Sequence, residues 1–123
     1  MRAVIPLVLL SLLPAQLATA EGTGDSHKQL HFGLEVARRG LWQEARFRFE
    51  RAVLLDATNA RAYNNLGVAL EQQGDFAKAR EAYEKALALR PGNASVQQNY
   101  DLFREADDKR NRKAKKKAST PTP

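Results

Sequence analysis

The chain of 123 residues contains no cysteine. Disulfide bonds, thiolate metal sites and a cysteine nucleophile are therefore excluded. A glycine-rich phosphate loop and a zinc-protease motif are also missing. The few serines and histidines do not have the spacing of a nucleophile, a base and an orienting group. The sequence therefore predicts a protein that is not an enzyme and binds no cofactor.

Histidine occurs only twice. His27 and His31 are four residues apart, so on a helix they share one face, which Glu35 continues. Two imidazoles without a third ligand of that kind make a poor metal site. We therefore predict no bound metal and interpret the pair as polar residues on an exposed helix face, with metal binding as the alternative.

Apolar runs are short, and the longest lies near the N-terminus. Residues 4–13 are apolar, but a spanning helix needs roughly 20 such residues. Arg2 precedes the run, and small residues at 18–20 (A-T-A) follow it as a cleavage site. We therefore predict that residues 1–20 are a secretory signal peptide and that Glu21 becomes the N-terminus. An uncleaved anchor and a buried core helix are the alternatives.

This leader predicts an exported protein. Its alanine-rich cleavage region is typical of bacterial signals, so we expect a periplasmic or secreted location. No cysteine follows the run, which excludes lipoprotein processing.

Negative charge is scarce at one end of the chain. The net charge is +6, from 20 Lys and Arg against 14 Asp and Glu. Residues 109–117 hold seven of these cations and no acid, whereas residues 21–108 carry 12 cations and 14 acids. Like charges repel and the proline-rich end cannot pack, so residues 109–123 are predicted to form a disordered basic tail.

A repeat of 34 residues organises the middle of the chain, where residues 26–59 and 60–93 stay in register. The matched pairs are Gly33 with Gly67, Gly40 with Gly74, Ala45 with Ala79, Arg46 with Arg80, Phe49 with Tyr83, Glu50 with Glu84, Ala52 with Ala86 and Leu55 with Leu89. A period of this length indicates a stacked array of helical hairpins.

Each unit has the apolar spacing of two amphipathic helices, about 26–39 and 42–55 in the first unit. In the second unit, Gly74 suits a left-handed helix end and Asp75 an N-cap. Glycine inside a helix costs about 1 kcal/mol relative to alanine. Gly33 and Gly67 accept that cost, which indicates a close approach of two backbones.

The repeated unit resembles the tetratricopeptide repeat (TPR). In the second unit the family's positions are occupied by Tyr63, Leu66, Gly67, Leu70, Ala79, Tyr83, Ala86 and Pro91. In the first unit they are occupied by Phe32, Gly33, Val36, Ala45, Phe49 and Ala52, with departures at Gln29 and Ala57. The resemblance implies an all-α array of about five helices in antiparallel pairs, and a function in binding other proteins.

The resulting organisation has six segments. They are a signal peptide at 1–20, a linker at 21–25, repeats at 26–59 and 60–93, a capping helix at 94–108 and a basic tail at 109–123. Two repeats and a cap are near the minimum for a stable array. Self-association or partner binding is therefore expected to add burial. Trp42 is expected to pack into its own hairpin, and an exposed recognition residue is the alternative.

The resemblance also implies a concave groove, lined by the first helix of each hairpin, that holds a partner protein or peptide. The residues expected to face it are His27, Leu30, His31, Leu34, Arg61, Asn64, Asn65, Val68, Gln72, Gln98 and Asn99. Asn64 and Asn65 suit a bound backbone, and Arg61 suits a carboxylate. A solvated helix face is the alternative. Chaperone-binding members have Lys and Asn where this chain has Leu30 and Leu34, so their carboxylate clamp is not expected.

The basic tail is a second candidate site, for anionic lipid or another envelope polyanion. Its cations are Lys109, Arg110, Arg112, Lys113, Lys115, Lys116 and Lys117. Export and the lack of interleaved aromatics argue against nucleic acid, and a solubilising tail without a partner is the alternative. The favoured function is an exported, non-catalytic adaptor or assembly scaffold that acts through its groove.

Overall fold

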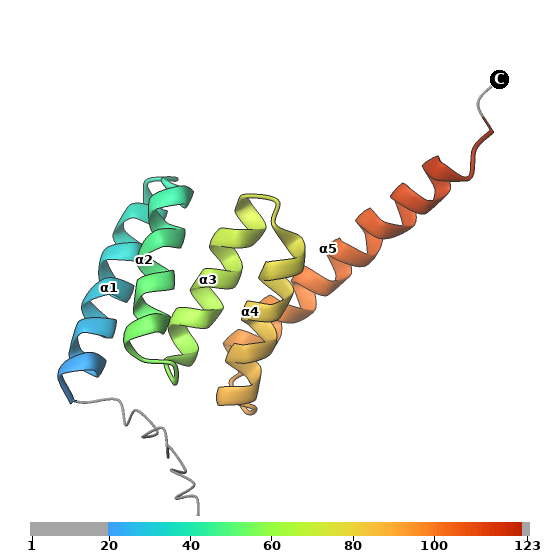
Figure 1. Ribbon diagram of the computed structural model, residues 1–123. Helices are drawn as coiled ribbons and strands as arrows, with labels where there is room; N and C mark the ends of the chain where they lie inside the picture. The colour runs from blue at the N-terminus through green and yellow to red at the C-terminus, as the bar shows by residue number, and fades with distance from the viewer. Residues whose placement is uncertain (1–19, 122–123) are drawn as a thin grey trace, which may run out of the picture.

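The computed structural model describes residues 20–121, which form five α-helices (Figure 1). These are α1 (Ala20–Arg38), α2 (Trp42–Leu55), α3 (Ala60–Gln72), α4 (Phe76–Leu89) and α5 (Ala94–Ala118). The described chain is therefore all-α, as predicted. Residues 1–19 of the predicted signal peptide lie outside the described residues.

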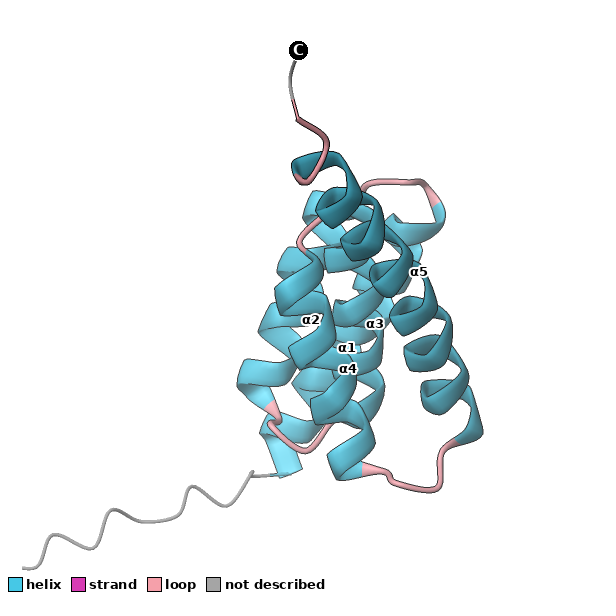
Figure 2. Cartoon of the chain, turned by 90° about the vertical axis from the view of Figure 1, so that its right-hand side faces the viewer, coloured by secondary structure: helices cyan, strands magenta, loops and turns pink. Residues whose placement is uncertain are grey.

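The helices pack as two antiparallel hairpins followed by a single helix. Helix α1 pairs with α2, α3 pairs with α4, and the hairpins meet through α2 and α3. Helix α5 packs on α4 and contacts α3. The loops before α3 and before α5 lie at the same end of the array (Figure 2). The predicted array of helical hairpins is confirmed.

The two mid-helix glycines make room for aromatic rings. A Cβ added at Gly33 would lie 2.5 Å from Cε1 of Phe49, and one added at Gly67 would lie 2.8 Å from the ring of Tyr83. The predicted close approach is confirmed at both sites. The approaching group, however, is an aromatic ring of the second helix in the same hairpin, and not a second backbone as we expected.

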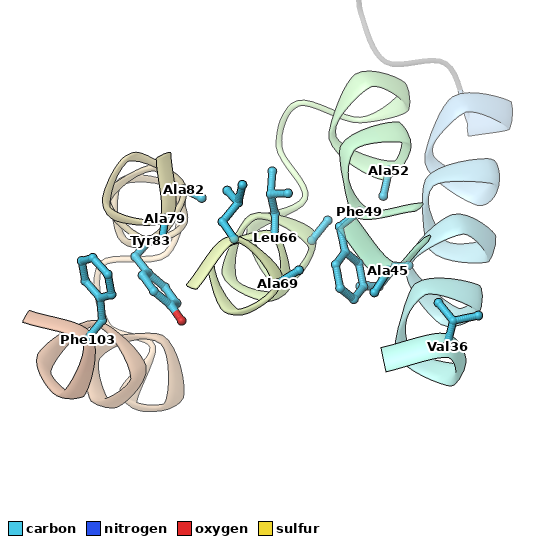
Figure 3. Close-up of a cluster of buried hydrophobic side chains, with 13 residues drawn as sticks. Val36, Ala45, Phe49, Ala52, Leu66, Ala69, Ala79, Ala82, Tyr83 and Phe103 are labelled. Carbon is cyan, nitrogen blue, oxygen red and sulfur yellow. The ribbon is translucent and has the colours of Figure 1, made fainter. Parts of the chain in front are cut away.

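The core is built from these rings and a row of alanines (Figure 3). Phe49, Tyr83 and Phe103 are almost fully buried. Burial raises the pKa of the Tyr83 phenol well above its usual range, and its hydroxyl donates a hydrogen bond of 2.9 Å to Glu71. Trp42 is half-buried against this core, in agreement with the expected packing role.

The turns between paired helices follow the sequence pattern with one exception. Gly40 and Gly74 have φ values of 74° and 76°, the left-handed conformation that ends a helix with little strain. Asp75 precedes α4, but its side chain makes no cap hydrogen bond. Its carboxylate instead lies 3.7 Å from the guanidinium of Arg46, so Asp75 occupies the predicted N-cap position without making the capping hydrogen bond.

The predicted linker at 21–25 is also wrong, because these residues belong to α1. A buried serine inside the same helix holds it to its neighbours. Ser26 Oγ donates to the carbonyl of Ala52 at 2.7 Å and accepts from Nδ2 of Asn59 at 2.9 Å. These two bonds join α1 to the end of α2 and to the start of α3.

The predicted disorder of the basic tail is wrong for residues 109–118, which continue α5 as regular helix. Lysine, arginine and alanine are strong helix formers, and cations are favourable near a helix C-terminus. The packed first half of α5 supplies the costly nucleus, so adding further turns is easier than starting a helix. The capping helix therefore extends well beyond the predicted end at 108 and projects from the body (Figure 1).

Candidate functional site

A groove of about 690 Å³ lies at the end of the array where α3 and α5 begin. Its walls come from α1, α3 and α5, and its end is formed by the loops before α3 and α5. The lining residues are His27, Leu34, Asp56, Thr58, Asn59, Ala60, Arg61, Asn64, Asn65, Arg90, Asn93, Ser95, Val96 and Asn99.

The groove contains some of the predicted residues and not others. Those present are His27, Leu34, Arg61, Asn64, Asn65 and Asn99. Val68 lies instead in a smaller hollow of about 230 Å³, which Leu34 and Asn65 also line. The remaining three predicted polar residues line neither hollow; they are His31, Gln72 and Gln98. Gln72, for example, ends α3 far from the loops that close the groove, so its placement in the groove is corrected. Leu30 is 2% exposed and belongs to the core.

The groove asparagines already have partners within the protein. Nδ2 of Asn99 donates to Oδ1 of Asn64 at 3.2 Å, which ties α5 to α3. Nδ2 of Asn65 donates to the carbonyl of Arg61 at 2.8 Å, within α3. Part of their hydrogen-bonding capacity is therefore structural. The Nδ2 group of Asn64 and the Oδ1 atom of Asn99 make no hydrogen bond within the described part of the chain. They could therefore bond to the backbone of a bound peptide.

Two further asparagines, which the sequence prediction missed, form the end of the groove. Asn59 accepts from the amide of Ala62 at 3.0 Å, and Asn93 accepts from the amide of Val96 at 3.1 Å. Each therefore caps a helix that lines the groove. Their spacing of 34 residues was the signal that could have identified them.

The charge of the groove is positive. Arg61 and Arg90 are exposed, and neither makes an ion pair within residues 20–121. Asp56 is the acidic member of the lining, and it is nearly buried. Its Oδ1 atom accepts from the amide of Thr58 at 2.9 Å and from its hydroxyl at 2.6 Å. Two guanidinium groups are thus left to bind anionic groups of a ligand.

One arginine in the basic part of α5, Arg110, is held by contacts within the protein. Nη2 of Arg110 lies 3.1 Å from Asp107, which also binds Nη2 of Arg80 at 2.8 Å. The guanidinium of Arg110 stacks 3.5 Å from the ring centroid of Phe76. The hydrogen bond from Arg80, helped by Arg110, holds the pKa of the Asp107 carboxyl below its usual value. This cluster fixes α5 on α4.

The six other cations of the predicted tail site are Lys109, Arg112, Lys113, Lys115, Lys116 and Lys117. All six are exposed, and none has an acidic partner in the part of the chain that the structure describes. In the same part, no group of three His, Cys, Asp or Glu could hold a metal ion. None of its helices has the length and apolar character required to cross a membrane.

Comparison with known proteins agrees with this architecture. The family model described as tetratricopeptide repeat matches residues 60–93, and the one described as TPR repeat matches residues 33–74. No curated protein sequence matches the chain.

Two solved TPR domains are similar in fold. The second TPR domain of human RPAP3, in complex with the HSP70 peptide SGPTIEEVD, has a TM-score of 0.62 and 21% identity. That match covers 65% of this chain and 67% of the RPAP3 chain. The Sgt2 TPR domain from Aspergillus fumigatus has a TM-score of 0.67 and 20% identity, over 80% of this chain and 64% of the other.

Residues 33–93 therefore match models of the tetratricopeptide repeat, and the described chain has the fold of a TPR array with about two repeats and a capping helix. Domains of this class are typically non-catalytic modules that bind other proteins or peptides.

Proposed function

We propose that this chain is a non-catalytic adaptor that holds an acidic segment of a protein partner in the groove between α1, α3 and α5. The observation that carries the proposal is the unpaired state of Arg61 and Arg90 in a groove whose own carboxylate, on Asp56, is already bonded to Thr58. A guanidinium group binds a carboxylate through two parallel hydrogen bonds, so each arginine can hold one acidic side chain.

Two further features favour an acidic ligand. Helices α3 and α5 begin beside the groove, and a helix N-terminus carries a partial positive charge. The free polar atoms of Asn64 and Asn99 face the same space and suit the backbone of an extended chain.

The RPAP3 domain offers a parallel, since the peptide in its structure ends in two glutamates, a valine and an aspartate. The clamp of the chaperone-binding members is not reproduced here, because Leu30 and Leu34 stand at two of its positions. We therefore assign acid recognition to Arg61 and Arg90.

Selection from a random nonapeptide display library tests this proposal. The wild-type protein should enrich peptides containing Asp and Glu. Arg61→Glu combined with Arg90→Glu should lose that enrichment and weaken binding of the selected peptides at least tenfold, because charged hydrogen bonds contribute about 1.5–3 kcal/mol each.

The matched control reverses two cations outside the groove, Arg51→Glu and Lys85→Glu, which occupy equivalent positions in the two repeats and are both exposed. This control should select the same acidic peptides as the wild type. If the groove variant also selects them, or if the wild type shows no preference for acids, the groove assignment is wrong.

We further propose that the protein is exported after removal of residues 1–20, in the periplasm or outside the cell. The support is the layout of the leader: one cation, a short apolar run and small residues before Glu21. Intact-mass measurement of the protein from its native source should place the N-terminus at Glu21. A chain that retains Met1 would contradict export with cleavage.

The basic half of α5 is a second candidate site, for an anionic membrane surface. The observation that favours it is the helix itself, which carries six unpaired cations away from the body in a fixed arrangement (Figure 1). Each cation near an anionic bilayer contributes about 1 kcal/mol, so six could contribute up to about 6 kcal/mol.

Sedimentation with vesicles tests the membrane proposal. The protein should bind vesicles rich in anionic lipid and lose binding at high salt, and neutral vesicles should not bind. Deletion of residues 114–123 removes three of the six cations and should weaken binding to the anionic vesicles roughly a hundredfold. Unchanged binding after the deletion would refute this second function and leave the groove proposal untouched.

A further inference from the structure

Large apolar side chains are exposed mainly on the first hairpin. Of the five such residues in the described chain, four lie there and one, Leu102, lies on α5. The four on the first hairpin are Phe32, Leu41, Phe47 and Leu54. Scattered exposed apolar residues are ordinary, but a contiguous group of them indicates an interaction site.

The internal repeat shows that these residues are not a requirement of the hairpin itself. Thirty-four residues later, Phe32 corresponds to Leu66, Leu41 to Asp75, Phe47 to Glu81 and Leu54 to Ala88. The first hairpin thus carries apolar side chains where the second has charged or small ones, apart from Leu66. Leu66 is 8% exposed, whereas Phe32 is 47% exposed.

The position of the two hairpins in the array explains that difference. Helices α1 and α3 are each the first helix of a hairpin and have similar contacts there. Each packs on the second helix of its own hairpin (α2 or α4), and each contacts the next first helix or capping helix along the array (α3 or α5). Helix α3 also packs against α2 of the preceding hairpin, whereas nothing in the described chain precedes α1. Phe32 therefore lies on the face where a further helix pair would pack.

Three of these four side chains form one surface together with Glu44 and Arg48; the three are Phe32, Leu41 and Phe47. We name these five residues the outer patch, which does not include Leu54. The guanidinium of Arg48 lies 4.3 Å from the ring centroid of Phe32 and 5.4 Å from that of Phe47. Leu41, Glu44 and Phe47 line a common hollow beside Trp42. Arg48 Nε bonds Glu44 at 2.8 Å, so the patch carries one cation and one acid.

The other end of the array does not complement this surface. Apart from Leu102, the exposed residues in the first half of α5 are mostly polar or charged, among them Gln97, Asp101, Arg104 and Glu105. Stacking the outer patch on them, head to tail, would bury charges against phenylalanine rings at a large desolvation cost. The outer patch itself is self-complementary, because it is apolar and contains both members of an ion pair.

We propose that the outer patch is the interface of a homodimer in which the first hairpins of two copies pack face to face. With α2 of the two copies antiparallel, Arg48 of one copy can pair with Glu44 of the partner subunit. Such a two-fold contact closes on itself and leaves no open surface for further growth. The groove between α1, α3 and α5 stays accessible, so the dimer presents two grooves.

Analytical ultracentrifugation over a range of concentrations tests the dimer. The N-terminus of the sample is first determined by intact-mass measurement. The protein should then sediment as a dimer. Phe32→Glu combined with Phe47→Glu should raise the dimer dissociation constant at least a hundredfold while leaving the helical circular dichroism unchanged. Leu102→Glu, the control at the remaining exposed apolar residue, should stay dimeric. A monomeric wild type, or a dimer that survives the double substitution, would overturn the proposal.

Cross-linking provides a test that does not depend on disrupting the patch. Because the chain has no cysteine, a single introduced thiol reports its own surroundings. Gln43 lies beside the outer patch, and Ala77 is the equivalent position in the second repeat. Both residues are exposed, and each is replaced by cysteine in a separate variant, Gln43→Cys and Ala77→Cys. A bis-maleimide should join two copies of the Gln43→Cys chain and leave the Ala77→Cys chain monomeric on a denaturing gel. Equal cross-linking of both variants, or of neither, would contradict a face-to-face dimer.

Discussion

At the scale of single residues, the array depends on a few positions that tolerate neither a larger side chain nor the loss of a charge. Gly33 and Gly67 lie under the rings of Phe49 and Tyr83, where an added methyl group would overlap the ring. Asp107 forms ion pairs with Arg80 and Arg110, and its side chain is nearly buried. Substitutions at these positions have effects that the helical pattern alone does not reveal.

Replacement of Gly33 or Gly67 by alanine is expected to lower the free energy of unfolding. The ring has to move to admit the methyl group, and overpacking typically costs 1–3 kcal/mol, roughly, against a gain of about 1 kcal/mol in helix propensity. Gly24→Ala is the control, since a Cβ there meets nothing within 4 Å, and it should stabilise α1. Urea denaturation measures all three variants. A stabilised Gly67→Ala protein would show that the ring position is not tightly constrained.

Substitution of Asp107 by asparagine should destabilise the protein in a pH-dependent way. The pKa of Asp107 is lowered by folding, so its contribution is present above the ordinary carboxyl pKa of about 3.9 and is lost as the pH falls through the folded-state pKa. At pH 7 the loss should be about 1–3 kcal/mol, and it should shrink towards zero as the pH falls through the folded-state pKa.

Denaturant unfolding of wild type and Asp107→Asn across this pH range measures the difference. Asp108→Asn is the matched control, because Asp108 is exposed and makes no ion pair found in the described chain. A constant difference between wild type and Asp107→Asn at every pH would contradict the assigned role of the carboxylate.

At the scale of helices, the beginnings of α3 and α5 are the points where neighbouring elements are joined. Asn59 and Asn93 occupy equivalent positions, and each caps the helix that follows it. Asn59 also donates to Ser26, which in turn donates to Ala52, so one side chain connects α1, α2 and α3. The start of α5 has no counterpart of Ser26 in that network.

The two asparagines should therefore differ in their effect on stability. Asn93→Ala should cost about 1 kcal/mol, the usual value of an N-cap. Asn59→Ala should cost about 2–3 kcal/mol, because a buried hydrogen bond is lost together with the cap. Thermal or urea unfolding of the pair compares them directly. Equal losses would mean that the Ser26 bond contributes nothing measurable.

At the scale of the whole molecule, α5 has two parts: a first half that packs on the body and a second half that extends away from it. Its first half packs on α4 as far as the cluster of Asp107 and Arg110, and beyond Arg110 the described residues are exposed. The folded body therefore ends within α5, and the remaining turns extend into solvent (Figure 1).

Truncation should reveal this boundary. A chain that ends at Lys113 keeps three further residues after Arg110, and its Tm should stay within about 2 °C of the wild type. A chain that ends at Ala106 loses the Asp107 cluster, and its Tm should fall by at least about 4–8 °C, the shift expected per kcal/mol in a domain of this size. Calorimetry measures both. A large fall with the longer chain would show that the basic half of α5 stabilises the body.

The fold could be predicted from the sequence because its determinants are local and repeated. The 34-residue period indicated the hairpins, the bounds of α2 were predicted correctly, and the mid-helix glycines indicated tight packing. Helical periodicity depends on neighbouring residues along the chain, so it can be read without knowledge of the tertiary contacts.

The candidate sites required the tertiary structure. The Asn64–Asn99 bond, the unpaired state of Arg61 and the Asp107 cluster each depend on residues from different helices, and their spacing in the sequence does not specify whether the side chains meet. The outer patch likewise could be identified only from burial, since Phe32 and Leu66 are both large apolar residues at the same repeat position, yet Phe32 is exposed and Leu66 is buried. The sequence by itself determined which helices form and how they repeat, because that information is local. The tertiary structure decided which side chains remain free to bind a partner, because exposure and pairing depend on all the helices at once.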